Sequence, residues 1–322
     1  MADSPRPTAI VALGGNALSP AGERADIHDQ FRYTRQSLGP IVDLALEGWN
    51  ICVVHGNGPQ VGDALVRNEV ARHEVSALPL GVLVAATAGW IGYMVSQSLA
   101  NALRRNGSDR DVATIITQVH VDPNDPAIEN PTKFIGHEIP ADRAQALIAE
   151  GQAIKPDGRG RMRRVVASPK PTAVQELAAI RHLLDRGTIV VACGGGGAPI
   201  WWDSANQGWE GVDAVVDKDL AAAVLARDLG AELLLILTDV DAVYADWGKP
   251  TQRALPRLTI AEAEAMDEAK AFGEGSMAPK IRAAIDFARR TGGRAIITEL
   301  RRGREAVAGR AGTTITGGGE RT

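Results

Sequence analysis

A lysine between two aspartates is the feature of this sequence that most clearly suggests chemistry. Lys218 lies between Asp217 and Asp219, and the alanine-rich residues 221–226 that follow are typical of a helix. Asp217 or Asp213 can cap the helix, which places Lys218 in a first turn where the helix dipole is positive. A cation is unfavourable there unless an anion binds beside it, and phosphate suits such a position. A surface lysine neutralised by its two aspartates is the alternative.

Two further lysines lie in contexts that suit the same chemistry. Lys280 opens another predicted helix, and Lys133 lies in a proline-rich stretch. Taken singly, each is more simply explained as a solvated surface residue. Several lysines and backbone N–H groups around one point can nevertheless transfer a phosphoryl group by positioning and charge neutralisation. The sequence therefore contains the parts of a phosphoryl-transfer site that needs no base and no nucleophile.

Three glycine-rich turns each follow a strand-like segment. They are Gly14-Gly15, Gly56-Asn57-Gly58 and the four glycines at 194–197. In an open parallel sheet such turns lie along the carboxyl edge, where ligands bind and glycine lets backbone N–H groups approach an anion. Tight turns alone would explain each one, but three in one chain favour a binding edge. The sequence has no G-x-x-x-x-G-K-[ST], and its closest glycine pattern is one residue too long for the dinucleotide fingerprint.

The elements that must position these residues alternate between strands and helices. Apolar runs predict strands at 8–13, 50–54, 112–117, 188–193, 232–238 and 294–298. Helical spacing predicts helices at 29–48, 172–186, 221–229, 258–272 and 275–290. Strands that are apolar throughout indicate a parallel sheet covered on both faces. The predicted fold class is α/β, a three-layer αβα sandwich around a central, mainly parallel sheet, with a small protruding subdomain.

The regular pattern breaks down between residues 122 and 171. This stretch is rich in proline, glycine and charge, and it holds one plausible helix at 141–150. Because a loop of this length is unusual in a compact domain, we expect a small inserted subdomain that folds over something. The basic run at 159–164 within it is interpreted as a solvated hairpin tip.

Composition and charge exclude several classes of protein. With 322 residues, 45% of them hydrophobic, the chain can bury a large core, and its net charge of −4 gives no electrostatic reason to expect nucleic acid. Cys52 and Cys193 lie in apolar, strand-like runs, which suits buried free thiols in a reducing compartment. The N-terminal residues carry no apolar core of a signal peptide. We therefore expect a cytoplasmic protein.

One segment, residues 75–103, contains no charged residue and is long enough to span a bilayer. Pro79, several glycines and a series of polar side chains argue against insertion. Its small residues permit close helix contact instead. We expect a buried helix or, preferably, a subunit interface, and therefore a homodimer without membrane association.

These residues and their order resemble the amino-acid kinase superfamily and, within it, the carbamate kinases. The resemblance extends from about residue 10 to residue 315. It rests on ALGGNAL (12–18), HGNGPQVG (55–62), PTK (131–133), ACGGGG (192–197), GVDAVVDKDL (211–220), LTDVDAVY (237–244), GSM (275–277) and PK (279–280). Ala12 stands where many members of the superfamily have a lysine. Carbamate kinases resemble this chain in lacking that lysine, and the resemblance implies that the positive charge comes instead from the position of Lys218. This distinguishes them from the acetylglutamate-type and aspartate-type kinases.

The resemblance implies a reaction. Carbamate and Mg-ATP would exchange a phosphoryl group reversibly to give carbamoyl phosphate and ADP, run in cells toward ATP synthesis. Mg²⁺ would be bound through the nucleotide phosphates and not by protein carboxylates. Residues 1–209 would form the acceptor lobe, with the inserted subdomain at about 122–171, and residues 210–322 would form the lobe that binds ATP or ADP.

The resemblance also implies roles for single residues. Lys218 would stabilise the phosphoryl group during transfer, Asp219 would orient the lysines, and Lys280 would neutralise the β and γ phosphates. Lys133 would reach in from the subdomain. The expected substrate-binding residues are Gly14, Gly15, Asn16, Gly56, Asn57 and Gly58. The expected nucleotide-binding residues are Lys218, Asp239, Tyr244, Met277 and Lys280.

Two residues depart from the family pattern. Phe134 stands where proline is usual and Ala278 where glycine is usual. If the backbone at Ala278 needs a positive φ, its Cβ is unfavourable and nucleotide binding could shift. Two other functions are considered: a kinase of another small carboxylate or phosphonate, and a non-catalytic nucleotide-binding regulator on the same fold.

Overall fold

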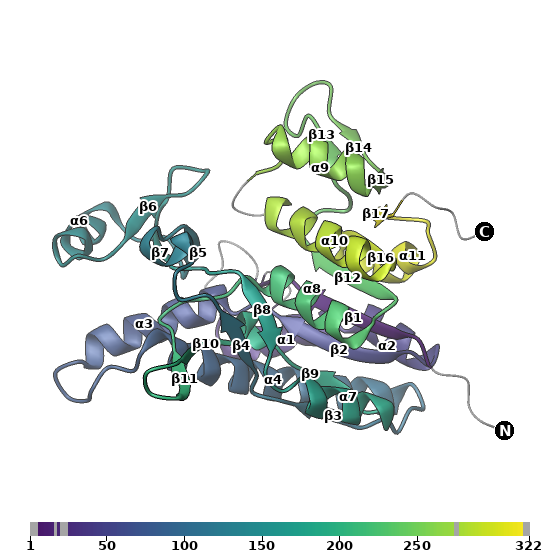
Figure 1. Cartoon of the computed structure of the whole chain (residues 1–322), viewed down its shortest axis with the longest axis horizontal. Helices are drawn as coiled ribbons and strands as arrows, with labels where there is room; N and C mark the ends of the chain where they lie inside the picture. Colours follow the sequence, from purple (N-terminus) through teal and green to yellow (C-terminus); the bar gives the residue numbers. More distant parts are fainter. Residues whose placement is uncertain (1–5, 16–17, 20–24, 274–276, 318–322) are drawn as a thin grey trace.

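The computed structural model describes residues 6–15, 18–19, 25–273 and 277–317. Its centre is an eight-stranded sheet in the order β15-β17-β16-β12-β1-β2-β9-β3 (Figure 1). The strands are β1 (Thr8–Leu13), β2 (Asn50–His55), β3 (Val112–Thr114), β9 (Ile189–Val191), β12 (Leu233–Thr238), β15 (Arg257–Thr259), β16 (Arg294–Glu299) and β17 (Thr313–Thr316). Every neighbouring pair except β16 and β17 is parallel. The predicted, mainly parallel sheet is therefore confirmed.

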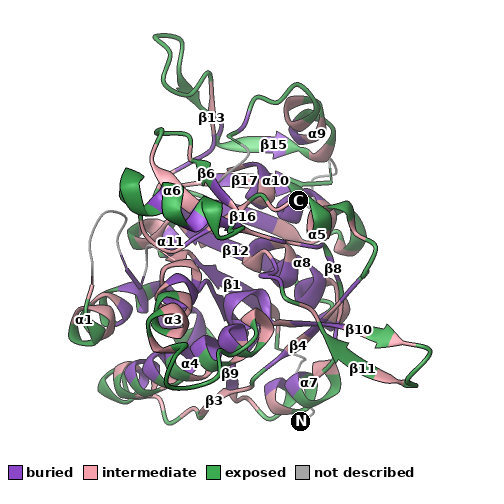
Figure 2. Ribbon diagram, turned by 90° about the vertical axis from the view of Figure 1, so that its left-hand side faces the viewer, coloured by how far each residue is buried: buried purple, intermediate pink, exposed green. Residues whose placement is uncertain are grey.

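Helices cover both faces of this sheet, because alternate residues of each strand enter different cores. Along β1, Ile10 and Ala12 belong to one hydrophobic cluster, while Val11 and Leu13 belong to the other. The first core is closed by α7 (Leu177–Asp185), α8 (Lys218–Leu229), α9 (Ile260–Glu268) and α10 (Met277–Thr291). The second is closed by α1 (Ile27–Ser37), α2 (Gly39–Leu46), α4 (Leu80–Arg105) and α11 (Gly303–Val307). Figure 2 shows the buried residues concentrated in these strands and in α8, so the three-layer fold is confirmed.

Three smaller sheets extend from the central layer. The first has the order β11-β10-β4-β8, the second pairs β13 with β14, and the third has the order β5-β7-β6. Their strands are β4 (Gln118–Val121), β5 (Lys133–Ile135), β6 (Ile154–Pro156), β7 (Met162–Val166), β8 (Pro171–Val174), β10 (Ala198–Asp203), β11 (Gly208–Gly211), β13 (Tyr244–Ala245) and β14 (Arg253–Ala254). The β5-β7-β6 sheet and α6 (Ala141–Ala149) protrude from the body in Figure 1. The short elements α5 (Pro126–Glu129), η2 (Gly194–Gly196) and η3 (Leu300–Arg302) complete the order.

The protruding subdomain is seated on α3 (Gly58–Ala71) by contacts that the sequence did not reveal. Gly136 donates its N–H to the carbonyl of Gly58 at 2.9 Å. A Cβ built on Gly62 would lie 2.1 Å from the Cα of Gly136, so only a glycine allows the two backbones to approach this closely. Arg164 is buried and pairs with Glu69 of α3. The interpretation of the whole basic run as solvated surface is therefore wrong at Arg164.

Several predicted boundaries are also wrong, each for a local reason. The helix predicted at 29–48 is two helices, because Pro40 lies in the first turn of α2 and only Leu38 separates α2 from the end of α1. The helix predicted at 172–186 begins only at Leu177, because β8 pairs with β4 before it. The helix predicted at 258–272 begins after β15. Cys193 lies beyond the end of β9, with a left-handed φ of 48°.

Helix α4 contains most of the apolar segment at 75–103. By length and composition alone it could cross a membrane, and half of its most apolar window is buried inside the protein. A Cβ on Gly92 would lie 2.2 Å from Thr114 Cγ2, which shows how closely α4 packs on β3. Its buried residues recur at helical spacing, and they include Leu83, Thr87, Ile91, Met94 and Leu99. Helix α4 is therefore a core helix of this fold.

Candidate active site

The start of α8 is built by one capping aspartate. The Asp217 carboxylate accepts hydrogen bonds from the N–H groups of Asp219 at 2.9 Å and Leu220 at 3.4 Å. Lys218 is consequently the first residue of the helix, as predicted, and Gly230 ends the helix with a left-handed φ of 70°. Asp217, and not Asp213, is the cap.

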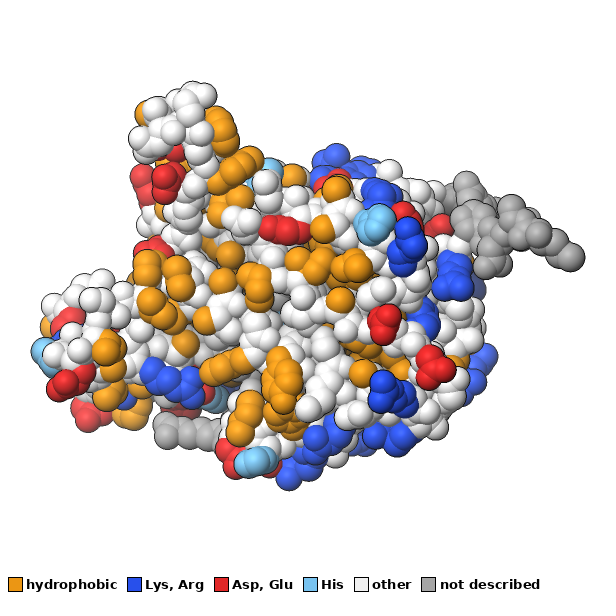
Figure 3. Space-filling view, turned by 90° about the horizontal axis from the view of Figure 1, so that it is seen from below, with side chains coloured by type: hydrophobic (Ala, Val, Ile, Leu, Met, Phe, Trp, Pro, Cys, Tyr) orange, Lys and Arg blue, Asp and Glu red, His pale blue; other side chains and the backbone are white. Residues whose placement is uncertain are grey.

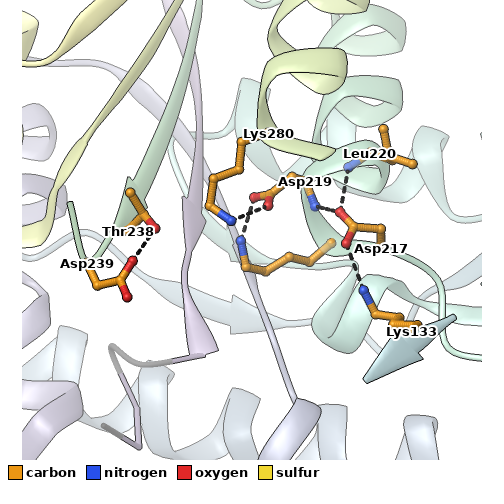
Figure 4. A network of polar contacts seen from close by, with 8 residues as sticks. Lys133, Asp217, Asp219, Leu220, Thr238, Asp239 and Lys280 are labelled. Carbon is orange, nitrogen blue, oxygen red and sulfur yellow. Dashed lines mark hydrogen bonds and ion pairs between the residues drawn. The ribbon is translucent and has the colours of Figure 1, made fainter. Parts of the chain in front are cut away.

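One carboxylate holds two lysines from different helices. Asp219 lies 2.5 Å from Lys218 Nζ through Oδ1 and 3.2 Å from Lys280 Nζ through Oδ2. Lys280 comes from the first turn of α10, which packs against α8. The Asp219 side chain is only 3% exposed, and the two lysine side chains are each 11% exposed. The two ammonium groups are thus fixed near one point with little access to water (Figure 4).

A third lysine reaches the same place from the protruding subdomain. Lys133, the first residue of β5, donates from Nζ to Asp217 Oδ2 at 2.7 Å (Figure 4). Three ammonium groups and two carboxylates leave one formal positive charge in the cluster of Lys133, Asp217, Lys218, Asp219 and Lys280. We call this set the lysine cluster. An incoming anion meets a site whose positive charges are already positioned.

The electrostatics of the lysine cluster keep both carboxylates ionised. Burial alone would raise the pKa of Asp219, but Lys218 and Lys280 together hold that pKa below its ordinary value. The pKa of Asp217 is lowered in the same way, against its burial, chiefly by Lys133 and Lys218. Burial lowers the pKa of Lys218, whereas attraction to Asp219 and Asp217 outweighs burial and raises the pKa of Lys280. Lys218 therefore gives up its proton more readily than Lys280 does.

Two of the glycine turns meet Lys218. A Cβ on Gly56 would lie 3.2 Å from Lys218 Cδ and 3.4 Å from the backbone N of Gly15. The N–H groups of Gly14 and Gly56 donate to the sheet carbonyls of Leu237 and Leu13. These two N–H groups extend the sheet in this structure and do not point free donors at the site. The predicted Asn16 lies outside the described residues.

The helix that follows the second turn offers donors instead. Helix α3 begins at Gly58, directly after β2 and Asn57, and no side chain caps its first turn. The first N–H groups of a helix have no partner within that helix, and its dipole is positive at this end. An anion at the carboxyl edge of β1 and β2 therefore has a helix N-terminus beside it.

The third glycine turn has a packing role. A Cβ on Gly195 would lie 2.3 Å from Asn57 Nδ2, and one on Gly196 would lie 2.2 Å from the carbonyl oxygen of Val216. Both glycines have positive φ, so side chains are excluded by space and by backbone conformation. Asn57 is buried and donates to Thr87 Oγ1 at 2.9 Å. Asn57 and the 194–197 turn therefore contribute to the site by packing against each other and against neighbouring residues.

The predicted nucleotide residues lie on the α10 side of the lysine cluster. Asp239 follows β12, accepts a hydrogen bond from Thr238 Oγ1 at 3.0 Å, and helps to raise the pKa of Lys280 (Figure 4). Met277 opens α10 and packs against the first core. Tyr244, in β13, donates its hydroxyl to Asp241 at 2.8 Å, and that bond raises the pKa of Tyr244.

The two departures from the family pattern cause no strain. Ala278 is buried in the first turn of α10 and is not among the residues with positive φ, so its Cβ is tolerated. Phe134, in β5, has the guanidinium of Arg163 over its ring at 5.6 Å. The expected shift of nucleotide geometry at Ala278 therefore has no basis in the backbone.

One residue of the site was missed by the sequence reasoning. His55 ends β2, is fully buried, and has its Nδ1 3.1 Å from the Gly56 carbonyl. Its Nε2 has no hydrogen-bond partner among the residues described, and a Cβ on Gly194 would lie 2.6 Å from it. Burial lowers the pKa of His55 to about 4, and the charge of Lys218 adds to that effect. A histidine directly before a glycine turn was the available signal.

Comparison with known proteins shows which family the chain belongs to. A profile of the amino acid kinase family matches residues 7–299. The chain is 40% identical to a carbamate kinase of Pyrococcus horikoshii over 311 residues, covering 95% of this chain and 98% of the relative. It is 43% identical to a carbamate kinase of Haemophilus influenzae over 308 residues, covering 95% and 96%. A solved carbamate kinase from Giardia lamblia bound to AMP-PNP superposes with a TM-score of 0.88 at 37% identity, covering 97% of this chain and 99% of that one.

Proposed function

The chain belongs to the amino acid kinase family and within it to the carbamate kinases, and we propose that the lysine cluster is where a phosphoryl group passes between ATP and carbamate. The observation that carries this proposal is the Asp219 carboxylate, which fixes Lys218 and Lys280 side by side at the carboxyl edge of the sheet. The site thus concentrates positive charge where negative charge moves during the transfer.

The transfer needs positioning and charge, and the chain supplies both. A carbamate oxygen attacks the γ phosphorus, the bond from that phosphorus to the β–γ bridging oxygen breaks, and ADP leaves with the electron pair. Lys218, at the helix N-terminus that faces Gly56, stabilises the phosphoryl group between the two oxygens. Lys280 neutralises the β and γ phosphates. Asp219 keeps both ammonium groups in place without itself taking a proton.

The acceptor is proposed to bind beside the first two glycine turns. Carbamate is a small planar anion, and the uncapped first turn of α3 offers it N–H donors. Gly15 and Gly56 keep the backbone close to Lys218, and the predicted Gly14, Asn16 and Gly58 belong to the same two turns. The side-chain amide of Asn57 donates to Thr87 and so positions this edge.

The nucleotide is proposed to bind along β12 and α10. Asp239 directly follows the end of β12, and Met277 is the first residue of α10, three positions before Lys280. Tyr244 is the first residue of β13. Residues 210–322 would then form the nucleotide lobe, and residues 1–209, with the subdomain at about 122–171, the acceptor lobe. A solved relative binds AMP-PNP, which supports a nucleotide site on this fold.

Magnesium fits this site through the nucleotide. Within the described part of the chain no group of three His, Cys, Asp or Glu side chains could hold a metal ion, and Asp217 and Asp219 are both bound to lysines. Mg²⁺ keeps most of its waters and takes few protein ligands when phosphates are present. When bound, it would neutralise the β and γ oxygens. Asp239 is a further carboxylate close enough to Lys280 to help raise its pKa.

The direction of the reaction, its compartment and the assembly are part of this proposal. We assign the reaction to ATP synthesis from carbamoyl phosphate in the cytoplasm. The assembly is a homodimer through α4, which exposes Val82, Trp90 and Tyr93, with Ile116 nearby also exposed. Figure 3 shows hydrophobic side chains gathered on the face of the molecule seen from below, where Figure 1 places α4. Aromatic residues on an exposed helix are typical of subunit contacts.

The test of function is ATP formation from carbamoyl phosphate and Mg-ADP. The intact protein is expected to turn over, and Lys218→Ala is expected to lose roughly 10²–10³-fold or more in rate. Arg159→Ala, an exposed change at the tip of the β6–β7 hairpin, is the control and should keep full activity. If the intact protein binds ADP but forms no ATP, the acceptor assignment fails. Turnover with another small carboxylate would then support the alternative kinase, and no turnover with any acid would support a regulator.

A further inference from the structure

We propose that a depression at the opposite edge of the central sheet binds a small dianionic oxyanion of the chemical class of phosphate. The depression has a volume of about 320 Å³, and it is lined by three arginines, Arg6, Arg110 and Arg186, together with Asp109 and Asp111. We call it the arginine depression. Nothing in the phosphoryl-transfer site uses these residues.

The arginine depression lies far from the lysine cluster in the topology of the sheet. Arg6 lies two residues before β1, Arg110 two residues before β3, and Arg186 three residues before β9. These strands are parallel to their neighbours, so the three arginines gather where the strands begin. The catalytic turns at Gly14 and Gly56 lie where strands end. Figure 3 shows Lys and Arg side chains gathered along the right-hand side of the molecule, the side from which β1 starts in Figure 1.

The arginines of the depression form no ion pair within the described part of the chain. Among the residues that the structure describes, no carboxylate lies within 4.0 Å of the guanidinium groups of Arg6, Arg110 or Arg186, although Asp109 and Asp111 line the same depression. Three cations and two anions leave one formal positive charge. Burial first, and then the charge of Arg6, lower the pKa of Arg110, so the two guanidinium groups repel each other. Excess positive charge at close range is what an anion would stabilise.

Arg110 is also short of an acceptor. Its Nε donates to the carbonyl of Gly187 at 2.8 Å, and its Nη1 donates to the carbonyl of Trp49 at 2.7 Å. These bonds fix the plane of the guanidinium group. Its Nη2 is buried and has no hydrogen-bond partner in the described ranges of the chain. A buried donor without an acceptor is costly. Because Nη2 is closed to solvent in this structure, an oxyanion in the arginine depression would become its acceptor only after the lining side chains move, and it would supply negative charge beside Arg110 in either case.

The remaining features of the arginine depression suit entry of a small ion. Arg6 and Arg186 are exposed, so their side chains can move to admit and then cover it. Gly187 has no side chain there, and a Cβ would lie 2.9 Å from Arg6 Nη1. A planar guanidinium fork matches a tetrahedral or planar oxyanion with two parallel bonds, which an ammonium group cannot do. Phosphate, free or carried on a small molecule, is therefore the chemistry that this site selects over chloride.

The experiment is equilibrium dialysis of the full chain against radiolabelled inorganic phosphate, with the catalytic site filled by Mg-AMP-PNP. The protein is compared with Arg6→Ala/Arg186→Ala and with a matched control, Arg159→Ala/Arg310→Ala, which removes the same charge from exposed positions elsewhere. Arg110 is left intact because it holds Gly187 and Trp49 in place. ATP formation from carbamoyl phosphate reports that every variant is folded.

The expected result is one phosphate per chain, weakened about tenfold or more for each arginine removed and unchanged in the control. ATP formation should be unchanged in all variants. Chloride should not displace the bound phosphate. Competition by glycerol 3-phosphate distinguishes free phosphate from phosphate carried on a small molecule: a site for the free ion rejects this ester, and a site for a phosphorylated metabolite binds it. Absence of phosphate binding to the AMP-PNP-filled protein would overturn the proposal. So would equal phosphate binding by Arg6→Ala/Arg186→Ala and the control.

Discussion

Lys133 and Asp217 lie 84 positions apart in the sequence, yet Lys133 Nζ donates to Asp217 Oδ2 at 2.7 Å. Asp217 is also the residue that caps α8. The ion pair therefore ties the protruding subdomain to the helix that carries Lys218, and an anion that draws Lys133 toward itself competes with Asp217. Assembly of the complete site is thereby coupled to the position of the subdomain.

Lys133→Ala should slow ATP formation by about 10–100-fold, because one positioned charge is lost from the transferring group. The free energy of unfolding should change by less than about 1 kcal/mol, since the pair is partly exposed. Arg159→Ala, on the same subdomain, is the matched control. Steady-state rates and urea unfolding check both expectations. A Lys133→Ala enzyme with the normal rate would remove Lys133 from the mechanism.

Asp219→Asn should be more damaging than Lys133→Ala. Without the carboxylate, the buried ammonium groups of Lys218 and Lys280 lose the one group that pairs with both, and the remaining carboxylate that attracts both of them, Asp217, is paired with Lys133. We expect ATP formation to fall at least about 100-fold and the free energy of unfolding to fall by about 3 kcal/mol. Asp213→Asn, at the carboxylate that could have capped α8 but does not, is the control. Equal kinetics of the two variants would contradict the orienting role of Asp219.

Gly62→Ala tests the seating of the subdomain. The new Cβ would lie 2.1 Å from Gly136 Cα, so α3 and the subdomain must move apart. Overpacking of this kind costs about 1–3 kcal/mol, and the displaced Lys133 should reduce the rate by about tenfold or more. Gly158→Ala, in the same subdomain with open space around it, is the control for kinetics and thermal unfolding. A fully active Gly62→Ala enzyme would show that the seating does not matter for catalysis.

His55 should make the protein less stable in mild acid. Its pKa is about 4 in the folded protein, against an ordinary value of 6.5, so the unfolded chain binds the proton more readily. Its contribution is present above pH 6.5 and is lost as the pH falls from 6.5 toward 4, by about 3 kcal/mol in total. Asp217 and Asp219, with lowered pKa values, lose their contributions only at lower pH. Urea unfolding of the protein and of His55→Gln at several pH values should show a shallower slope for the variant. Identical slopes would rule out His55 as the source.

The proposed α4 interface predicts a change of mass. Tyr93→Glu places a charge on the exposed face of α4 and should convert a dimer into a monomer at micromolar concentration. Trp247→Glu, at an exposed aromatic residue on another part of the surface, should leave the mass unchanged. Analytical ultracentrifugation gives both masses. A monomeric unmodified protein would refute the interface.

The sequence predicted the fold class well because most of the signal is local. Continuous apolar runs, glycine stops and an aspartate cap each act within a few residues, as at the start of α8. Long-range pairing was harder to predict. Strand β8 exists because Pro171–Val174 pairs with β4, and the alternating β-branched Thr172 and Val174 are too short a signal to separate these four residues from the helix that follows.

The same distinction applies to the site. The lysines were recognised by their neighbours, and the structure brings Lys133, Lys218 and Lys280 to two aspartates. The sequence could not show that Asn57 faces Thr87, or that the 194–197 turn is filled by protein atoms. In a sequence, a glycine whose missing side chain makes room for a neighbouring residue cannot be distinguished from one that makes room for a ligand. The structure of the neighbouring residues is needed to separate the two cases. His55 was overlooked for the same reason.

Lys218, Asp219 and Lys280 all come from the packed pair α8 and α10, whereas Gly15, Gly56 and the first turn of α3 come from the other end of the chain. Under the proposed function, the residues assigned to the phosphoryl group belong to one packed pair of helices, and the turns assigned to the acceptor lie outside it. Changes in the turns after β1 and β2 would then alter which acid is phosphorylated while that pair stays intact. Acceptor preference on this scaffold is open to selection or redesign by loop exchange.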